Sequence, residues 1–437
     1  MRGRNTRPTE GRNGPAKELP PVTVTIEALA HKGEGRATVD GEVLHVPFTL
    51  PGETARVAPD GRGRARLLEV LEPSDARVVP PCRHFGTCGG CALQHMDRDA
   101  LLAWKREQVV ASLAARGLGD VEPLVEPTVD AGGEGRRRAV LAATRAGQKI
   151  LLGFHERASH RLVGVEECPV LLPAVVERLP LFKRLAGLVM PRKGEVGLTV
   201  LAADGGLDLA MTSTAKLAPR ATAELIEAAM TGGVSRLSLN GEVLVESKPP
   251  VLDMGGLPLV PPPAGFVQAT KAGEEALAAR VLEGVGDARK VADLFCGAGT
   301  FALRLAAKAS VRAVEGEAAS LAALDRAWRT AGGKLREITC ERRDLFRNPL
   351  TGEDLDDFGK GMEAVVFDPP RAGAEDQARE IARSRVSRVV AVSCNSATLA
   401  RDLRHLVDGG YRVLSVLPVD QFRFSPHIEV VAVLARD

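Results

Sequence analysis

Apolar and polar positions alternate in two different patterns along the C-terminal part of the chain, from about residue 265 to 437. Short apolar runs typical of buried strands are followed by stretches with helical spacing, which predicts a doubly wound α/β fold. These strand-like runs are residues 290–295, 311–314, 364–367 and 388–393. Two later runs, 413–418 and 428–434, have no long helix between them and are expected to form an antiparallel pair that closes the sheet.

The first 264 residues show other patterns. Residues 1–19 place basic side chains among Gly, Pro and Asn, and are expected to form a disordered basic tail. In residues 20–75 short β-type runs alternate with Gly and Pro turns, which predicts a small antiparallel barrel of the oligonucleotide-binding kind. Residues 76–264 mix strand-like runs with helical stretches at 101–118 and 173–188, and are expected to form an α+β domain.

Composition narrows the class of protein. The chain has no uninterrupted apolar stretch of about 18 residues and no apolar signal core at its start, so we expect a cytoplasmic protein without a membrane segment. The net charge is only +2, yet arginines cluster at 62–66 and 136–138. Together these clusters favour a phosphate-binding surface, and hence an RNA or DNA partner.

Four of the seven cysteines have the spacing of a metal site. In a reducing compartment, cysteines act more often as ligands or catalysts than as disulfides. Four thiolates suit either a [4Fe–4S] cluster or tetrahedral zinc, and the single C-x2-C pair favours iron and sulfur. The four are Cys82, Cys88, Cys91 and Cys168.

A glycine loop, Cys296-Gly-Ala-Gly-Thr300, stands between an apolar strand and an expected helix at 301–308. The glycines at 297 and 299 let backbone amides approach a ligand closely. Ala302 occupies the place of the third glycine of the dinucleotide fingerprint, which argues against NAD. Glu315 ends the next strand, where a carboxylate accepts ribose hydroxyls, and Asp344 is expected near an adenine edge. Because no phosphate-binding P-loop is present, S-adenosylmethionine is the preferred ligand over a nucleoside triphosphate.

Three later motifs supply candidate chemistry. Asp368-Pro-Pro-Arg371 ends a buried strand, and its prolines can shape a rigid pocket wall. Cys394 precedes a helical stretch, whose N-terminus favours a thiolate, so it is a candidate nucleophile. Alternatively, Cys394 is a buried structural cysteine. Glu429, at the start of an expected strand, is a candidate base, and His427 is a weaker candidate. Alternatively, Glu429 is an ordinary carboxylate at the rim of the protein surface. A thiolate that adds to carbon 6 of uracil activates carbon 5 toward a methyl donor, and a carboxylate then removes the carbon-5 proton.

Together these residues resemble the RNA (uracil-5)-methyltransferase family, in particular its iron–sulfur branch that modifies 23S ribosomal RNA. The resemblance covers residues from about 20 to 437. It implies a TRAM RNA-binding domain for residues 20–75 and a class I S-adenosylmethionine-dependent methyltransferase domain for residues 265–437. It also implies a [4Fe–4S] cluster in residues 76–264, in which Cys168 is the fourth ligand.

The resemblance further implies roles for individual residues. It makes Cys394 the nucleophile and Glu429 the general base. The donor-binding positions that it implies are Gln268, Phe295, Thr300, Glu315, Asp344 and Asp368. Thr270, Thr300 and Ser396 depart from the residues that the family usually has at their positions, so they bear on donor affinity more than on the reaction.

Three alternatives remain open at this point. A tRNA uridine carbon-5 methyltransferase shares the chemistry, although that branch generally lacks both the barrel and the cluster. Enzymes that methylate an exocyclic base amine typically have an aromatic residue after Asp-Pro-Pro, where this chain has Arg371. A non-catalytic ribosome-assembly factor would need only the barrel and the cluster. The sequence leaves the modified uridine and the oligomeric state open.

Overall fold

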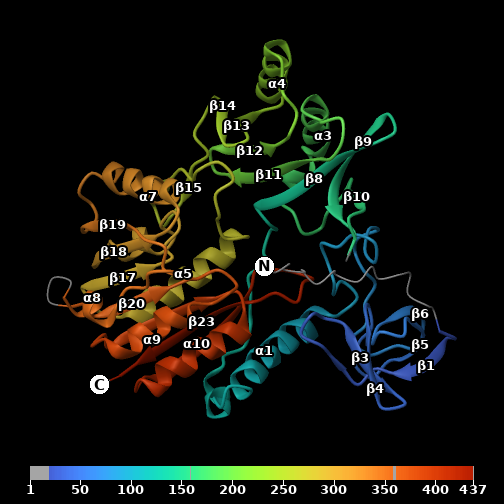
Figure 1. The fold of residues 1–437 in the computed structure, drawn as a ribbon, viewed down its shortest axis with the longest axis horizontal. Coiled ribbons are helices and arrows are strands. Elements are labelled where there is room, and N and C mark those ends of the chain that lie inside the picture. The colour runs from blue at the N-terminus through green and yellow to red at the C-terminus, as the bar shows by residue number, and fades with distance from the viewer. Residues whose placement is uncertain (1–18, 158, 358–360, 437) are drawn as a thin grey trace, which may run out of the picture. The chain divides into compact units, whose positions relative to one another are not determined.

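The computed structural model describes residues 19–157, 159–357 and 361–436. The basic tail expected at 1–19 lies outside the described residues except for Leu19. The chain divides into two compact units, which are described separately below and can be followed in Figure 1. One unit comprises Met1–Pro80 and Ala92–Asp97, and the other comprises Pro81–Cys91 and Arg98–Asp437.

The first unit is built from two three-stranded antiparallel sheets, with strand orders β1-β5-β6 and β2-β3-β4. Alternate residues of these strands point inward, and both sheets contribute to one apolar core that includes Ile26, Val46 and Val57. The buried Glu53 carboxylate pairs with Arg77 and so holds the segment after the last strand. The strands are β1 (Val22–Thr25), β2 (Ala28–Leu29), β3 (Gly35–Val39), β4 (Glu42–Val46), β5 (Thr54–Pro59) and β6 (Ala65–Glu72).

In the second unit, a seven-stranded sheet has the order β10-β9-β8-β11-β12-β13-β14. Helices α3 (Leu179–Leu188) and α4 (Pro219–Thr231) share an apolar core with it, through Phe182 and Leu225. The helix expected at 173–188 is interrupted after α2 (Pro173–Val176), because Pro180 favours a fresh first turn over a continuous helix. The strands are β8 (Arg138–Ala146), β9 (Lys149–His155), β10 (Leu162–Gly164), β11 (Glu195–Ala203), β12 (Gly206–Thr212), β13 (Val234–Leu239) and β14 (Glu242–Glu246). A small hairpin of β15 (Leu252–Asp253) and β16 (Pro258–Leu259) follows.

An eight-stranded sheet with the order β19-β18-β17-β20-β21-β23-β22-β7 forms the C-terminal part of this unit. Neighbouring strands from β19 to β21 are parallel, whereas β23 runs antiparallel to both β21 and β22. This confirms the antiparallel closing pair expected from the sequence. The strands are β7 (Val129–Asp130), β17 (Lys290–Leu294), β18 (Ser310–Glu315), β19 (Ile338–Arg342), β20 (Ala364–Phe367), β21 (Arg388–Ser393), β22 (Arg412–Asp420) and β23 (Glu429–Ala435).

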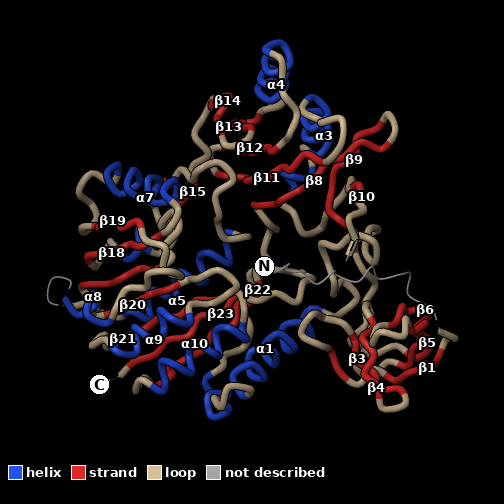
Figure 2. Tube along the Cα trace, in the orientation of Figure 1, coloured by secondary structure: helices blue, strands red, loops and turns tan. Residues whose placement is uncertain are grey.

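Both faces of this sheet are covered by helices, as Figure 2 shows. Successive residues of one strand enter different cores: Val291 packs with α5, α6 and α7, whereas Ala292 packs with α1, α9 and α10. Helix α6 is shorter than the expected 301–308, because the chain must already turn back to start β18 at Ser310. The helices are α1 (Arg98–Ala114), α5 (Lys271–Val285), α6 (Ala302–Leu305), α7 (Ala318–Thr330), α8 (Gly352–Asp357), α9 (Glu375–Arg383) and α10 (Ser396–Asp408).

Residues 98–130 belong to this C-terminal sheet in space, although the sequence places them in the range 76–264. Val109 and Leu113 of α1 pack in the same apolar core as Leu399 of α10. The 3-10 helix η1 (Gly119–Leu124) follows, and β7 then pairs with β22 through Val129 and Val419. Among the described residues, no helix is both long and apolar enough to cross a membrane.

Candidate active site

The candidate residues gather at one edge of the eight-stranded sheet. Parallel strands β17, β18, β20 and β21 all end there, and ligands of such folds bind at the carboxyl ends of the strands. Asp368 follows β20 and Cys394 follows β21. Glu429 is the first residue of β23, and because β23 is antiparallel to β21, its start lies at the same edge.

The glycine loop after β17 is shaped by its backbone. Gly299 has φ +100, and a Cβ on it would lie 2.4 Å from Leu324 Cδ1, so only glycine fits. Glu315, at the end of the neighbouring β18, faces this loop. Its Oε2 accepts a hydrogen bond from the Gly297 amide at 3.1 Å, and its Oε1 accepts one from the Glu317 amide at 2.8 Å.

Aromatic side chains lie beside the loop. Phe295 adopts a left-handed backbone with φ +59, which a side-chain-bearing residue rarely does and which often marks a functional site. Its ring centroid lies 5.3 Å from that of Phe346, whose amide donates to Asp344 Oδ1 at 3.1 Å. Strands β17, β18 and β19 are neighbours, so the predicted donor-binding residues Phe295, Glu315 and Asp344 share one side of the edge.

The carboxyl groups of Asp293, Glu315 and Asp368 make this edge suited to a cationic ligand. Burial raises the pKa of Asp368 to about 7. Burial, and then the charges of Asp368 and Glu315, raise the pKa of Asp293 well above its ordinary value, and the Ala302 amide only partly opposes this rise. Among the described residues, no hydrogen bond of standard geometry reaches either carboxylate oxygen of Asp293. A positively charged ligand, such as the sulfonium and ammonium groups of S-adenosylmethionine, would favour the ionised forms of these carboxyl groups, which burial alone disfavours.

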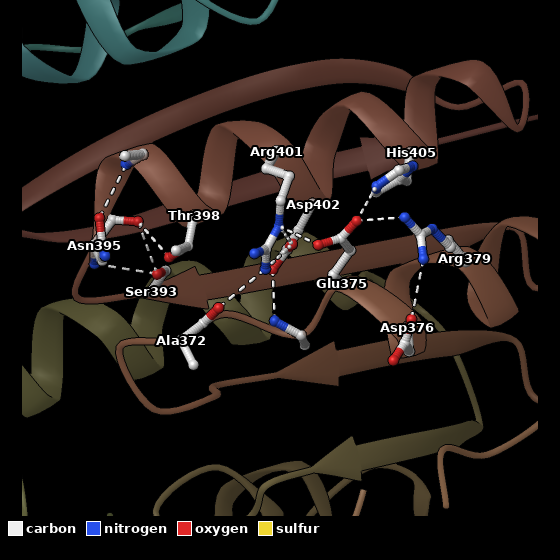
Figure 3. Close-up of polar contacts among 12 residues, drawn as sticks. Ala372, Glu375, Asp376, Arg379, Ser393, Asn395, Thr398, Arg401, Asp402 and His405 are labelled. Atoms are coloured by element: carbon white, nitrogen blue, oxygen red, sulfur yellow. Dashed lines mark hydrogen bonds and ion pairs between the residues drawn. The ribbon is translucent and has the colours of Figure 1, made fainter. Parts of the chain in front are cut away.

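Cys394 lies in a turn that hydrogen bonds fix on both sides. Asn395 caps α10, since its Oδ1 accepts from the Ala397 amide at 3.1 Å. Its Nδ2 donates to the Arg371 carbonyl at 3.1 Å, which ties this turn to the Asp-Pro-Pro-Arg loop. The Ser393 hydroxyl oxygen accepts from the Asn395 amide at 3.1 Å (Figure 3).

Further along α10, two side chains hold the same loop, as Figure 3 shows. The buried Asp402 carboxylate accepts a hydrogen bond from the Ala374 amide at 2.6 Å. Arg401 donates to the Ala372 carbonyl at 3.0 Å and pairs with Glu375 of α9 at 3.3 Å. The loop after β20 and the turn after β21 are therefore built as one piece, which fixes Asp368 and Cys394 in the same rigid frame.

The thiol of Cys394 is protonated in the free protein at neutral pH. Burial, and then the charges of Glu429 and Asp368, raise its pKa to about 11, and Arg371 opposes this rise. The sequence predicted that the N-terminus of α10 would lower the pKa of Cys394, but burial and the two carboxylates outweigh that effect. Neutralising the two carboxylates by a cationic ligand would lower the pKa of the thiol and favour the nucleophilic thiolate.

Glu429 is 3% exposed, and burial followed by the charge of Asp368 raises its pKa well above the ordinary value. A buried carboxyl of this kind is suited to general-base catalysis near neutral pH. His427 is less suited, because burial and then the charge of Arg371 lower its pKa to about 4. Its Nε2 also lies 3.2 Å from an Arg371 guanidinium nitrogen.

Two of the three departures from the family pattern, Thr270 and Ser396, have local structural roles. Thr270 caps α5: its hydroxyl oxygen accepts from the Gly273 amide at 2.9 Å and donates to the Ala131 carbonyl at 2.7 Å. The Ser396 hydroxyl lies 2.8 Å from that of Ser112 on α1.

Sequence reasoning missed several buried polar residues that build the site. Gln421, at the end of β22, contacts both Gln268 and Glu429. Lys105 is fully buried on α1, and its ammonium donates to Asp420 Oδ1 at 2.6 Å and to the His427 carbonyl at 2.8 Å. The only sequence signal is a polar residue within a buried pattern, which does not reveal its distant partner.

A second group of buried charged residues, also missed by sequence reasoning, supports the predicted S-adenosylmethionine-binding residues. Glu274, buried in the first turn of α5, pairs with Arg137 and with Arg304. Arg137 donates to the Gln268 carbonyl at 3.1 Å, and Arg304 donates to the Thr300 carbonyl at 2.7 Å. Glu274 therefore links the two backbone segments that carry predicted donor-binding residues.

The four clustered cysteines all lie in the second unit, half-buried and without a disulfide. Cys88 Sγ accepts a hydrogen bond from the Gly90 amide at 3.4 Å, and the Val170 and Leu171 amides bond to Cys168. Burial, and then the charges of Cys82 and Cys88, raise the pKa of Cys168. Within the described part of the chain, however, no group of three or more His, Cys, Asp or Glu residues has the arrangement of a metal site.

Comparison with known proteins identifies the family. The model of the tRNA (uracil-5-)-methyltransferase family matches residues 266–437, the range that holds all predicted donor-binding and catalytic residues. An uncharacterized RNA methyltransferase of Brucella suis is 48% identical over 94% of this chain and 97% of its own length. The 23S rRNA (uracil(1939)-C(5))-methyltransferase RlmD of Halomonas elongata is 35% identical over 94% of this chain and 89% of its own length. The chain belongs to the RNA (uracil-5)-methyltransferase family. Membership makes it an S-adenosylmethionine-dependent enzyme of this class.

A solved structure supports the fold of this methyltransferase. The tRNA (uracil-54, C5)-methyltransferase of Pyrococcus abyssi, in complex with S-adenosyl-L-homocysteine, superposes with a TM-score of 0.73. The match covers 94% of this chain and 99% of that chain, at 21% identity. The Pyrococcus protein thus shares the fold over nearly the whole length of the chain.

Proposed function

We propose that the protein methylates carbon 5 of a uridine in 23S ribosomal RNA through a covalent intermediate on Cys394. The placement of a thiol, a buried carboxyl and a glycine loop at one sheet edge carries this proposal. The relative from Halomonas elongata, which is named for a 23S rRNA uridine, supports the choice of substrate. An RNA substrate of this kind implies a cytoplasmic enzyme.

The proposed mechanism assigns one step to each of these side chains. The Cys394 thiolate adds to carbon 6 of the uracil ring, so that carbon 5 becomes nucleophilic. When bound, S-adenosylmethionine supplies an electrophilic methyl group, and forming the bond from carbon 5 to this methyl breaks the methyl–sulfur bond. Glu429 then accepts the proton from carbon 5. The electron pair of that C–H bond restores the ring double bond as the bond between carbon 6 and Cys394 breaks, which regenerates the thiolate.

The donor would be held by the glycine loop and by the residues around it. Glu315 and Asp344 are assigned to the ribose and adenine, as their places at the end of β18 and after β19 suggest, with Phe295 and Phe346 beside them. Gln268, Thr300 and Asp368 are assigned to the methionine end, where Asp368 meets Gln268 at 3.4 Å. Gly297 and Gly299 shape the loop itself: the Gly297 amide donates to Glu315 Oε2 at 3.1 Å, and the Gly299 amide donates to the Cys296 carbonyl at 2.9 Å.

Residues 20–75 are proposed to be a TRAM domain that binds the RNA. The observation that supports this is the pair of small antiparallel sheets around one core, a geometry typical of oligonucleotide-binding barrels. The solvent-exposed Arg62 and Arg66 lie beside and within β6 and add positive charge for phosphate contacts.

Cys82, Cys88, Cys91 and Cys168 are proposed to hold a [4Fe–4S] cluster. The Gly90 amide donates a hydrogen bond to Cys88 Sγ at 3.4 Å, and the charges of Cys82 and Cys88 add to the burial that raises the pKa of Cys168. Both observations support the proximity of these three thiols. Methyl transfer moves no net electrons, so the cluster is assigned a structural or RNA-contacting role.

Metal analysis tests the cluster. Protein purified without oxygen is expected to contain iron and acid-labile sulfide in equal amounts, and Cys88→Ser should lose both. Cys340→Ser is the matched control, since Cys340 is a half-buried cysteine of β19 outside the proposed ligand set. Stoichiometric zinc in place of iron and sulfide would contradict the assignment.

Mass mapping of RNA tests the substrate. Deleting the gene is expected to remove a 5-methyluridine from 23S rRNA and to leave tRNA unchanged, and the wild-type gene should restore it. Loss of the modification from tRNA instead would make the protein a tRNA methyltransferase. Complementation with a catalytically inactive variant separates this activity from a non-catalytic role in ribosome assembly.

A further inference from the structure

Gln421 lies between the predicted donor-binding residue Gln268 and the candidate base Glu429. It directly follows β22 and is only 1% exposed. Its Nε2 donates to Gln268 Oε1 at 2.6 Å and to Glu429 Oε1 at 3.3 Å. Its Oε1 accepts a hydrogen bond from the Thr270 amide at 3.3 Å. A buried amide with both ends engaged has a fixed orientation.

The contact with Glu429 affects the chemistry of the candidate base. Burial and the charge of Asp368 disfavour the ionised form of Glu429, whereas the hydrogen bond from Gln421 favours it. Hydrogen bonds to a charged acceptor are stronger than those between neutral groups. Gln421 therefore both aims the carboxylate and helps to keep it ionised, which a base requires before it can accept a proton.

Through Gln268, the hydrogen-bonded network extends to Asp368, another predicted S-adenosylmethionine-binding residue. Gln268 accepts from Gln421 through Oε1 and donates from Nε2 to Asp368 Oδ2 at 3.4 Å. Side chains from four separate segments thus form one chain of hydrogen bonds, Glu429–Gln421–Gln268–Asp368. A shift at either end changes the hydrogen bonds of the other end, because each amide has a limited number of donors and acceptors.

We propose that Gln421 is a positioning residue for the second half of the reaction, in which it holds ionised Glu429 in place to remove the carbon-5 proton. This inference rests on the proposed function. It assigns Gln421 no contact with the substrate, so formation of the covalent adduct does not depend on it. Resolution of the adduct does depend on it.

The two half-reactions can be measured separately. RNA that contains 5-fluorouridine forms the adduct with Cys394 and accepts the methyl group. The adduct then persists, because the base cannot remove fluorine from carbon 5. Ordinary RNA reports the complete cycle. At saturating S-adenosylmethionine, which offsets any weaker donor binding through Gln268, Gln421→Met is expected to leave the rate of adduct formation on fluorinated RNA within about twofold of the wild type. It should slow product release from ordinary RNA by about 10- to 100-fold, the effect of losing one hydrogen bond to a charged group.

The pH profile provides a second readout. Without Gln421 the ionised form of Glu429 loses a favourable partner, so the pKa of Glu429 rises further. The midpoint of the rise in product release with pH is therefore expected to move to higher pH in Gln421→Met. A purely structural role would lower both half-reactions together and leave this midpoint unchanged, and either result would overturn the proposal.

Two further variants protect the test against misfolding. Gln421→Glu keeps the shape of the side chain but places a carboxyl beside Glu429, so it should also slow release without leaving a cavity. Gln377→Met is the matched control: Gln377 is also 1% exposed, and its amide pairs with the backbone of Leu350, which lies outside the site. Normal release by Gln421→Glu would contradict the proposal. A wild-type enzyme that methylates no uridine would instead refute the proposed function itself.

Discussion

Replacing Cys394 with alanine is expected to reduce methyl transfer by at least about 10³-fold, as removal of a catalytic nucleophile does in other enzymes. Without the thiol no bond to carbon 6 forms, and carbon 5 of uracil remains too weak a nucleophile. The measurement is transfer of a labelled methyl group from S-adenosylmethionine to a 23S rRNA transcript. In parallel, 5-fluorouridine RNA should no longer form a denaturation-resistant complex with the variant.

The control for this experiment is Cys340→Ala, which removes a thiol that lies on β19 and not at the reacting edge. It should retain both methyl transfer and complex formation. The fold of Cys394→Ala can be checked by its binding of donor, since the glycine loop and Glu315 are unchanged. Substantial turnover by Cys394→Ala, with an intact fold, would remove the nucleophile assignment and the mechanism built on it.

Replacing Glu429 with glutamine is expected to lower turnover by about 10²- to 10⁴-fold, the usual contribution of a general base. The amide cannot accept the carbon-5 proton, so the methylated adduct is not resolved. Cys394 still adds to the ring, however, and the removal of a negative charge beside it even favours the thiolate. Ordinary, unfluorinated RNA should therefore remain bound to this variant through a covalent bond that survives denaturation.

Gel electrophoresis under denaturing conditions detects this trapped complex, and mass spectrometry should place the RNA on Cys394. Glu283→Gln, on the exposed face of α5, is the control and should turn over normally without trapping. Low turnover without any trapped RNA would show that Glu429 acts before the adduct forms. In that case another group must accept the carbon-5 proton.

The alternating pattern of strands and helices predicted β17, β18, β20 and β21 of the C-terminal sheet, because these strands are largely buried and each precedes a polar motif. The antiparallel pair β22 and β23 followed from the absence of a helix between two apolar runs. Helix lengths were harder to predict. Pro180 divides one expected helix, and the start of β18 limits α6, since both effects depend on how the chain must turn.

The sequence indicated the proposed nucleophile and base but not the buried polar residues around them. Cys394 and Glu429 stand beside recognisable motifs, so their chemistry can be predicted locally. Gln421 and Lys105 cannot be found in this way, because their partners lie far away in the sequence: Lys105 meets Asp420, and Gln421 meets Gln268. The raised pKa of the Cys394 thiol was also unforeseen, since it arises from burial and from two carboxylates brought close only by folding.

The position of α1 and β7 has a consequence for how the gene can be divided. The eight-stranded sheet is completed by a segment that precedes the central seven-stranded sheet in the chain, so the central sheet is inserted within the catalytic fold. A fragment that starts at residue 265 would expose the edge of β22 and the apolar side of α10 that α1 covers. Shortened versions for crystallography or directed evolution should therefore retain residues 98–130, supplied either in the same polypeptide or as a second, co-expressed piece.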